Sequence, residues 1–142
     1  MASGSKRAFP IRKGGVFTGR VAVVDANPKA KDWKTDIQAF AQSVYKGPLL
    51  SMPLLLRLVF WMPRPKWHFR TGKNAGQLKG DSPTVPRGKP DLLKLASGDE
   101  DALTNILWLD DAQITEEQLS KRYATDEQKP GVWITIATVG DS

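Results

Sequence analysis

The spacing of apolar residues predicts two helices that each pack one face against a core. Between positions 30 and 45 the apolar residues recur every three or four positions, and Gly47-Pro48 would end this helix. The stripe consists of Trp33, Ile37, Phe40, Ala41 and Val44. A second stripe follows Asp91, a favoured N-cap residue. It consists of Leu92, Leu95, Ala96, Ala102, Leu103 and Ile106.

Runs of leucine, aromatic and β-branched residues predict the strands. The expected strands are residues 21–24, 49–62, 113–123 and 131–139, and residues 106–109 are expected to be a short buried strand or the lead-in to a turn. Arg57 lies near the middle of the longest one and would face a partner or the site. The Glu-Glu-Gln content of residues 113–123 also permits a helix. Together these elements predict one α+β domain over residues 1–142, a mixed β-sheet with two main helices packed on it.

Two segments lack apolar periodicity and are rich in Gly, Lys and Arg. Residues 1–19 are expected to form a flexible basic arm, with a hairpin around Gly14-Gly15. Residues 63–89 are expected to form a long basic loop between the central strand and the second helix. A loop of this length in a compact domain is usually functional or disordered.

Composition narrows the possible chemistry. The chain has no cysteine and one histidine, His68, so a thiolate zinc site and a Ser-His triad are not expected. Any metal would bind oxygen ligands, which favours Mg²⁺ or Mn²⁺. The apolar run at 49–62 contains Arg57 and is too short to cross a membrane, and residues 1–19 lack the apolar region of a signal peptide. We therefore expect a cytoplasmic protein without a membrane partner.

Charge is distributed unevenly along the chain. The net charge is +6, yet ten of the 15 acidic residues fall between Asp91 and Glu127. Residues 63–89 contain seven Lys or Arg residues and one acid, Asp81. Basic segments around an acidic centre suit an enzyme that binds phosphates with its loops and brings metal ions to one of them. The alternative is ordinary solvated loops.

Aromatic and cationic residues alternate in the basic loop. Trp67 and Phe69 stand between Lys66 and Arg70, an arrangement that fits stacking on exposed bases together with phosphate contact. The two aromatic residues would equally serve to anchor the loop to the core. His68 is too isolated in this sequence to carry acid-base catalysis on its own.

Asp99 falls on the apolar stripe of the second helix. A buried unpaired carboxylate is unfavourable, so two explanations are open. Either Asp99 reaches a cation or metal, or the helix breaks at Ser97-Gly98 and Asp99 caps a new one.

The candidate metal ligands are Asp91 and the pair Asp110-Asp111, which a helix followed by a short strand could fold into one pocket. Simpler roles are available for each. Asp91 could be only an N-cap and Asp110-Asp111 a plain turn, while Lys94 could be a solvated lysine and Asp101 a structural salt bridge or cap.

A set of motifs runs from Lys89 to Gln113. It comprises Lys89-Pro90-Asp91, Lys94, Asp101-Ala102-Leu103-Thr104, Trp108 and Asp110-Asp111-Ala112-Gln113. This set resembles the RusA-type Holliday junction resolvases of bacteriophages and prophages. Four further segments fit the same family, so the resemblance covers most of the chain. They are Gly4-Ser5-Lys6-Arg7, Asn27-Pro28-Lys29 with Trp33, Pro63-Arg64-Pro65-Lys66 and Lys121-Arg122-Tyr123.

The resemblance implies a Mg²⁺-dependent, homodimeric endodeoxyribonuclease that binds four-way DNA junctions and makes paired symmetric cuts, in a bacterial or phage-infected cytoplasm. Mn²⁺ is a possible substitute for Mg²⁺. By the same resemblance Asp91, Asp110 and Asp111 are the metal-binding catalytic residues and Lys94 supports them electrostatically. The residues expected to contact DNA are Lys6, Arg7, Lys66, Arg70, Lys73 and Lys89.

Two positions depart from the family pattern. Leu93 stands where the family often has a second Asp, and Ser97 where it has a basic residue. The family also usually has a strand before its Gly-Ser-Lys-Arg motif, so the first strand here would be truncated and one sheet edge exposed. The alternative function is therefore a catalytically impaired or inactive protein of the same fold that binds branched DNA.

Overall fold

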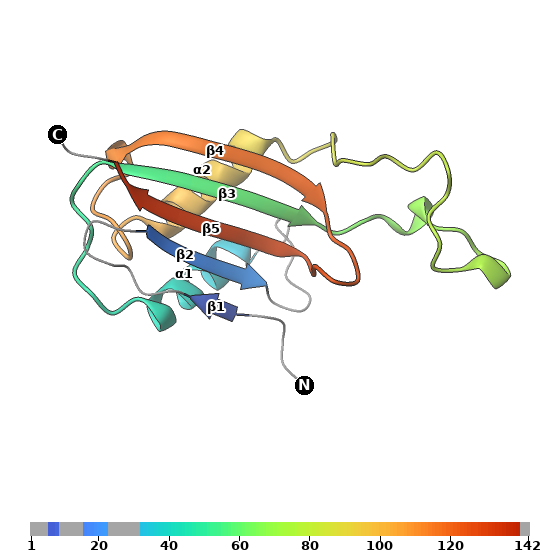
Figure 1. Ribbon diagram of the computed structural model, residues 1–142, viewed down its shortest axis with the longest axis horizontal. Helices are drawn as coiled ribbons and strands as arrows, with labels where there is room; N and C mark the ends of the chain where they lie inside the picture. The colour runs from blue at the N-terminus through green and yellow to red at the C-terminus, as the bar shows by residue number, and fades with distance from the viewer. Residues whose placement is uncertain (1–5, 9–15, 23–31, 140–142) are drawn as a thin grey trace.

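The computed structural model describes residues 6–8, 16–22 and 32–139, which form a five-stranded sheet with two α-helices on one face (Figure 1). The strand order is β1-β2-β5-β3-β4. The strands are β1 (Lys6–Ala8), β2 (Val16–Ala22), β3 (Leu54–Met62), β4 (Ile114–Tyr123) and β5 (Gly131–Thr138). β3 and β4 are parallel, whereas the other neighbours are antiparallel. The predicted α+β fold with a mixed sheet is confirmed.

The first two strands differ from the flexible arm expected over residues 1–19. The backbone pairs Arg7 with Arg20 between β1 and β2, and Arg20 in turn with Trp133 of β5. The arm prediction is wrong for these residues, because each strand is paired with a neighbouring strand whose backbone supplies hydrogen bonds. The rest of the arm, with the hairpin expected around Gly14-Gly15, lies outside the described residues.

The core lies between the sheet and α1 (Trp33–Val44) and α2 (Leu92–Leu103). In β3 alternate residues are fully buried, and Arg57 is exposed on the opposite face, as period-two alternation requires. The buried set comprises Leu54, Leu56, Leu58, Phe60 and Met62. The apolar stripe of α1 is confirmed at Trp33, Ile37, Phe40 and Ala41.

β3 begins at Leu54, five residues later than expected, directly after Pro53, which cannot donate to a strand ladder. Of the two alternatives for residues 106–109, the strand is wrong and the lead-in to a turn is confirmed. Asn105 takes a left-handed conformation with φ 70°, and Trp108 forms only isolated bridges with Leu50 and Thr104. The chain therefore turns here instead of extending.

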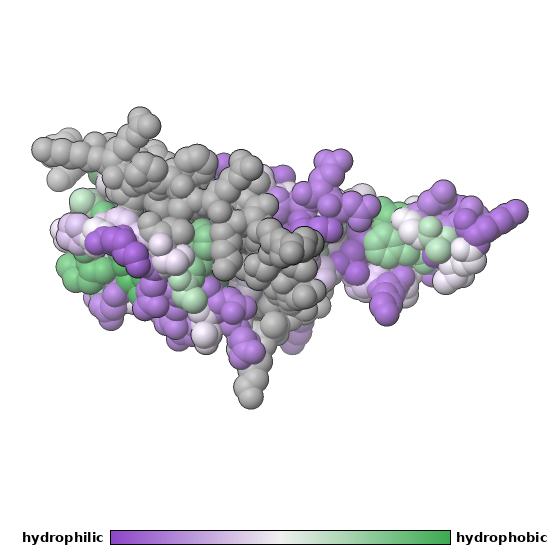
Figure 2. Space-filling model, turned by 90° about the horizontal axis from the view of Figure 1, so that it is seen from below, coloured by the Kyte–Doolittle hydropathy of each residue, from purple (hydrophilic) through white to green (hydrophobic). Residues whose placement is uncertain are grey.

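The basic loop (residues 63–89) leaves the end of β3 and projects beyond the sheet before it returns to α2 (Figure 1). It contains two short 3₁₀ helices, η1 (Lys66–His68) and η2 (Gly72–Asn74). Figure 2 shows hydrophilic residues over much of the projecting loop, around an apolar area. This part of the chain thus connects β3 to α2 without an α-helix or a β-strand of its own.

Candidate functional site

Asp91 and Lys94 lie at the start of α2. Asp91 is the N-cap residue, but its side chain makes no capping hydrogen bond. Both residues are exposed, and Leu93, the apolar residue between them, is 74% exposed. The Asp91 carboxylate therefore does not cap the helix. The exposed side chain of Leu93 lies two residues further along the chain.

Asp110 and Asp111 open a short 3₁₀ helix, η3 (Asp111–Gln113), directly before β4. Asp110 Oδ1 accepts a hydrogen bond of 2.9 Å from the N–H of Ala112, and Gln113 Oε1 accepts one of 2.8 Å from the N–H of Asp110. This reciprocal pattern is a capping box. The plain-turn role considered for Asp110 is therefore present, and one of its oxygens is occupied.

Gln113 fixes this turn to the start of the central strand. Its Nε2 donates to the carbonyls of Leu50 at 2.9 Å and Met52 at 3.0 Å. Trp108, fully buried two residues before Asp110, anchors the other side of the turn. The Asp110-Asp111 pair is thus held at a defined place. Gln113 was matched only as a family residue, and its positioning role depends on contacts distant in sequence.

Asp111 lies among other acids. A side-chain interaction with the neighbouring Asp110, then burial and the charges of Asp110 and Asp101, raise the pKa of the Asp111 carboxyl. Glu100 of α2 likewise pairs with Glu117 of β4. Burial, followed by this pairing and the charge of Glu117, raises the pKa of Glu100 to about 8. We call these five residues, Glu100, Asp101, Asp110, Asp111 and Glu117, the acidic cluster.

Sequence reasoning missed Glu100 and Glu117 as members of this site. The sequence alone did not give the register in which β4 pairs with β3. Glu117 is opposite Leu56 of β3, whose side chain is fully buried under the helices, so Glu117 lies on the helix-facing side of the sheet. Strand alternation would have shown which glutamate faces α2, provided that residues 113–123 were known to be a strand.

Asp91 is separated from the acidic cluster along α2. Asp101 follows Asp91 by ten residues, which corresponds to roughly 15 Å of helix. Asp91 is not among the groups that perturb Asp111. Within the described residues no three Asp, Glu or His side chains form a group that could hold a metal ion. The convergence of Asp91, Asp110 and Asp111 in one pocket is therefore not found within a single chain.

The helix break considered for Asp99 is not found. α2 is continuous from Leu92 to Leu103, so no new helix begins at Asp99. The side chain is fully buried and Oδ1 accepts a 2.9 Å hydrogen bond from Trp33 Nε1. Burial raises the pKa of Asp99 to about 7, against a smaller lowering by the Trp33 bond. Its role in the described structure is to join α2 to α1.

In the basic loop, Lys66, Arg70, Lys73 and Lys89 are all exposed, as expected for residues that contact phosphates. The side chains of Lys6 and Arg7 lie outside what the structure describes. Trp67 is 65% exposed, which does not fit the anchoring role considered for it. The buried residue of this segment is His68, whose Nδ1 accepts a hydrogen bond of 3.1 Å from Arg64 Nη1.

The comparisons with known proteins agree with this fold and residue set. Residues 11–137 match the family "Endodeoxyribonuclease RusA". The chain therefore belongs to the RusA endodeoxyribonuclease family. It is also similar to the uncharacterized protein YqaN of Bacillus subtilis (strain 168), with 24% identity over 127 residues, covering 89% of this chain and 86% of YqaN.

The RusA family supplies the coarse function, that of a nuclease acting on DNA junctions. The described helices include none with the length and apolar character needed to span a bilayer.

Proposed function

We propose that this protein is a divalent-metal-dependent endodeoxyribonuclease that resolves four-way DNA junctions by paired symmetric cuts, acting as a homodimer with Mg²⁺, or Mn²⁺ in its place. Membership of the RusA family supports the reaction class. Paired cuts require two active sites, and one site in each chain of a dimer supplies them. The observation that carries the proposal is the adjacent carboxyl pair Asp110 and Asp111, held on the surface by η3, where the interaction of the two groups raises the pKa of Asp111.

The carboxyl pair fits a hard cation chemically. Two neighbouring carboxylates repel each other, and a bound cation relieves that repulsion. Mg²⁺ is usually bound through one or two carboxylates, water and substrate phosphates, and does not need an all-protein cage. Asp111 and the second oxygen of Asp110 would hold the ion, and a bound ion would activate water and neutralise the leaving oxygen.

The remaining site residues act at the other end of α2. Asp91 has an uncommitted carboxylate and is proposed as a further metal-binding catalytic residue, with Lys94 one helical turn away to offset negative charge. Lys66, Arg70, Lys73 and Lys89, together with Lys6 and Arg7, would bind the DNA backbone. Contacts to phosphates place the substrate without reading its sequence.

A second candidate function follows from Leu93. Its side chain is 74% exposed beside Asp91, where the family often has a carboxylate, and Ser97 on the next turn replaces a basic residue. Loss of these groups favours a protein that binds branched DNA without cutting it.

One experiment separates the two candidates. The wild type, Asp111→Asn and the distant surface variant Asp126→Asn are each incubated with a four-way junction and with a linear duplex, with and without Mg²⁺. The nuclease proposal expects Mg²⁺-dependent paired cuts by the wild type and Asp126→Asn, and junction binding without cuts by Asp111→Asn. Cleavage unchanged in Asp111→Asn refutes its role. Salt-sensitive junction binding by the wild type without cuts supports the inactive binding protein.

A further inference from the structure

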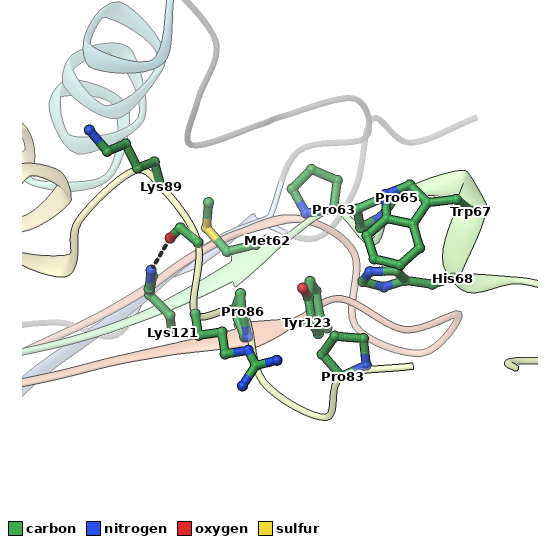
Figure 3. A pocket seen from close by; sticks show the side chains of 12 residues that line it. Met62, Pro63, Pro65, Trp67, His68, Pro83, Pro86, Lys89, Lys121 and Tyr123 are labelled. Atoms are coloured by element: carbon green, nitrogen blue, oxygen red, sulfur yellow. Dashed lines mark hydrogen bonds between the residues drawn. The ribbon is translucent and has the colours of Figure 1, made fainter. Parts of the chain in front are cut away.

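A cavity of about 320 Å³ lies between the basic loop and the ends of β3 and β4 (Figure 3). Its walls include Trp67 and His68 on one side and Lys121 on the other, with Tyr123 between them (Figure 3). Four prolines, Pro63, Pro65, Pro83 and Pro86, complete the apolar surface. The volume is at the lower end of the range for sites that bind small organic groups.

The loop side of this cavity is held in shape by contacts within the loop itself. Arg64 Nη1 reaches His68 Nδ1 at 3.1 Å and donates to the carbonyl of Pro83 at 2.8 Å. The backbone carbonyl of His68 accepts from Ser82 Oγ at 2.6 Å and from the N–H of Lys79 at 2.9 Å. The two limbs of the loop are therefore joined across the buried His68 ring, and the cavity exists before any ligand binds.

His68 acts here as a neutral spacer. Burial, and then the charges of Arg64 and Lys79, lower its pKa. Its ring packs edge-on against Trp67, with centroids 4.1 Å apart, and against Tyr123 at 5.3 Å. The Arg64 guanidinium lies 4.1 Å from the centre of the Tyr123 ring on that side of the loop. The His68 and Tyr123 rings therefore support one side of Trp67, and most of the indole remains exposed to solvent.

The opposite end of the cavity is positively charged and adjoins Asp91. Arg87 and Lys89 line it and are exposed. Lys121 Nζ donates to the carbonyls of Gly88 at 2.8 Å and Pro90 at 3.0 Å, which fixes the segment leading directly into Asp91. An aromatic surface at one end and cations at the other match the two parts of a nucleotide, its base and its phosphate.

We propose that this cavity receives one unpaired nucleotide of the bound DNA, whose base stacks on Trp67 while its phosphate lies near Arg87 and Lys89. The inference rests on the proposed function for its substrate and adds the recognition of an unstacked base close to Asp91. A base in an intact duplex is already stacked on both faces, so the cavity favours single-stranded or branched positions, where leaving the stack is least unfavourable.

Binding of a fluorescent base tests this proposal without any cleavage step. The probe is a single-stranded decanucleotide with one 2-aminopurine, whose fluorescence falls when it stacks on an aromatic ring, titrated without divalent metal. The wild type should quench the probe, and Trp67→Phe should retain the quench. Trp67→Ala should lose it and bind roughly 5- to 150-fold more weakly, as expected for one base-aromatic stack.

Val85→Ala is the matched control, because Val85 is an exposed apolar residue of the same loop that does not line the cavity. It should quench and bind like the wild type. A wild type that does not quench the probe, or Trp67→Ala with unchanged quench and affinity, overturns the proposal. Cleavage of junctions in Mg²⁺ by a wild type without quench would leave the nuclease function standing. If the wild type quenches the probe but never cuts DNA, the nucleotide-binding cavity is supported and the nuclease function is not.

Discussion

The indole N–H of Trp33 donates a 2.9 Å hydrogen bond to Asp99 Oδ1, joining α1 to α2 where both side chains are buried. The second oxygen, Asp99 Oδ2, is also buried and finds no hydrogen-bond partner among the described groups. An ionised carboxylate with one neutral donor is poorly solvated there, so burial raises the pKa of Asp99 to about 7. The fold is therefore most stable when this carboxyl is protonated.

The first prediction concerns stability and pH. The folded-state pKa of Asp99 lies above 3.8, the ordinary value of an aspartate side chain. The stabilisation from the protonated carboxyl is thus complete below pH 4 and is lost as pH rises to about 7, a total of roughly 4 kcal/mol. Asp99→Asn keeps an acceptor for Trp33 and removes the charge. We expect it to raise the free energy of unfolding by about 1 to 3 kcal/mol at pH 8 and by less at pH 4.

Urea denaturation of both proteins at the two pH values measures this difference. Asp126→Asn, at an exposed aspartate between β4 and β5, is the control and should leave the stability unchanged. An Asp99→Asn variant less stable than the wild type at pH 8 would contradict the assignment.

The second prediction concerns Glu117, which faces Glu100 across the gap between β4 and α2. Because the pKa of Glu100 is raised to about 8, the pair repels once the pH passes that value and is relieved by a proton below it. Glu117→Gln should therefore raise the melting temperature at pH 9 by about 1 to 3 °C and change it little at pH 5. Calorimetry at both pH values provides the measurement.

Glu116→Gln is the matched control for that experiment. Glu116 is the preceding residue of β4, is exposed, and by strand alternation lies on the other face of the sheet. An equal rise for both variants would show that the effect is one of net charge and not of the Glu100–Glu117 pair.

Sequence periodicity predicted the elements whose cause is local. The α1 stripe of Trp33, Ile37 and Phe40, and the long apolar β3, follow from the spacing of residues that must leave water together. β1 could not be found in this way. Lys6–Ala8 has no apolar pattern, and its extended form depends on the backbone of β2.

The site was predictable only in its parts. Asp110-Asp111 and Asp91 stood out as acids near a helix, but their separation is set by the direction of α2 relative to β4. The partner of Asp99 is 66 residues away in sequence. For Trp67 the sequence left base stacking and anchoring open, and the structure buries the polar His68 ring while the large apolar Trp67 ring is exposed. In each case a contact distant in sequence decided the outcome.

The third prediction concerns Lys121, which holds the end of the basic loop through Gly88 and Pro90. Lys121→Met keeps much of the side-chain length and removes both donors, so the loop should open more often near residue 88. We expect stability to fall by about 1 kcal/mol and protease cleavage between residues 79 and 90 to accelerate. Mass spectrometry of the fragments locates the cuts. Arg122→Met, the next residue of the same strand, should not accelerate cleavage there, and an equal acceleration would contradict the role of Lys121.

The last prediction concerns the phosphate contacts of the basic loop. If Lys66, Arg70 and Lys73 each neutralise one phosphate, DNA binding by the triple alanine variant should release about three fewer counterions than binding by the wild type. The slope of log K against log salt for junction binding should then become shallower by about 2 to 3, with weaker binding at low salt. Fluorescence anisotropy at several salt concentrations measures the slope.

The exposed pair Lys34 and Lys46, in α1 and just after it, serves as the control for lost charge. Replacing that pair should leave the slope near its wild-type value, and an equal change in both variants would mean that net charge, not the basic loop, binds the DNA.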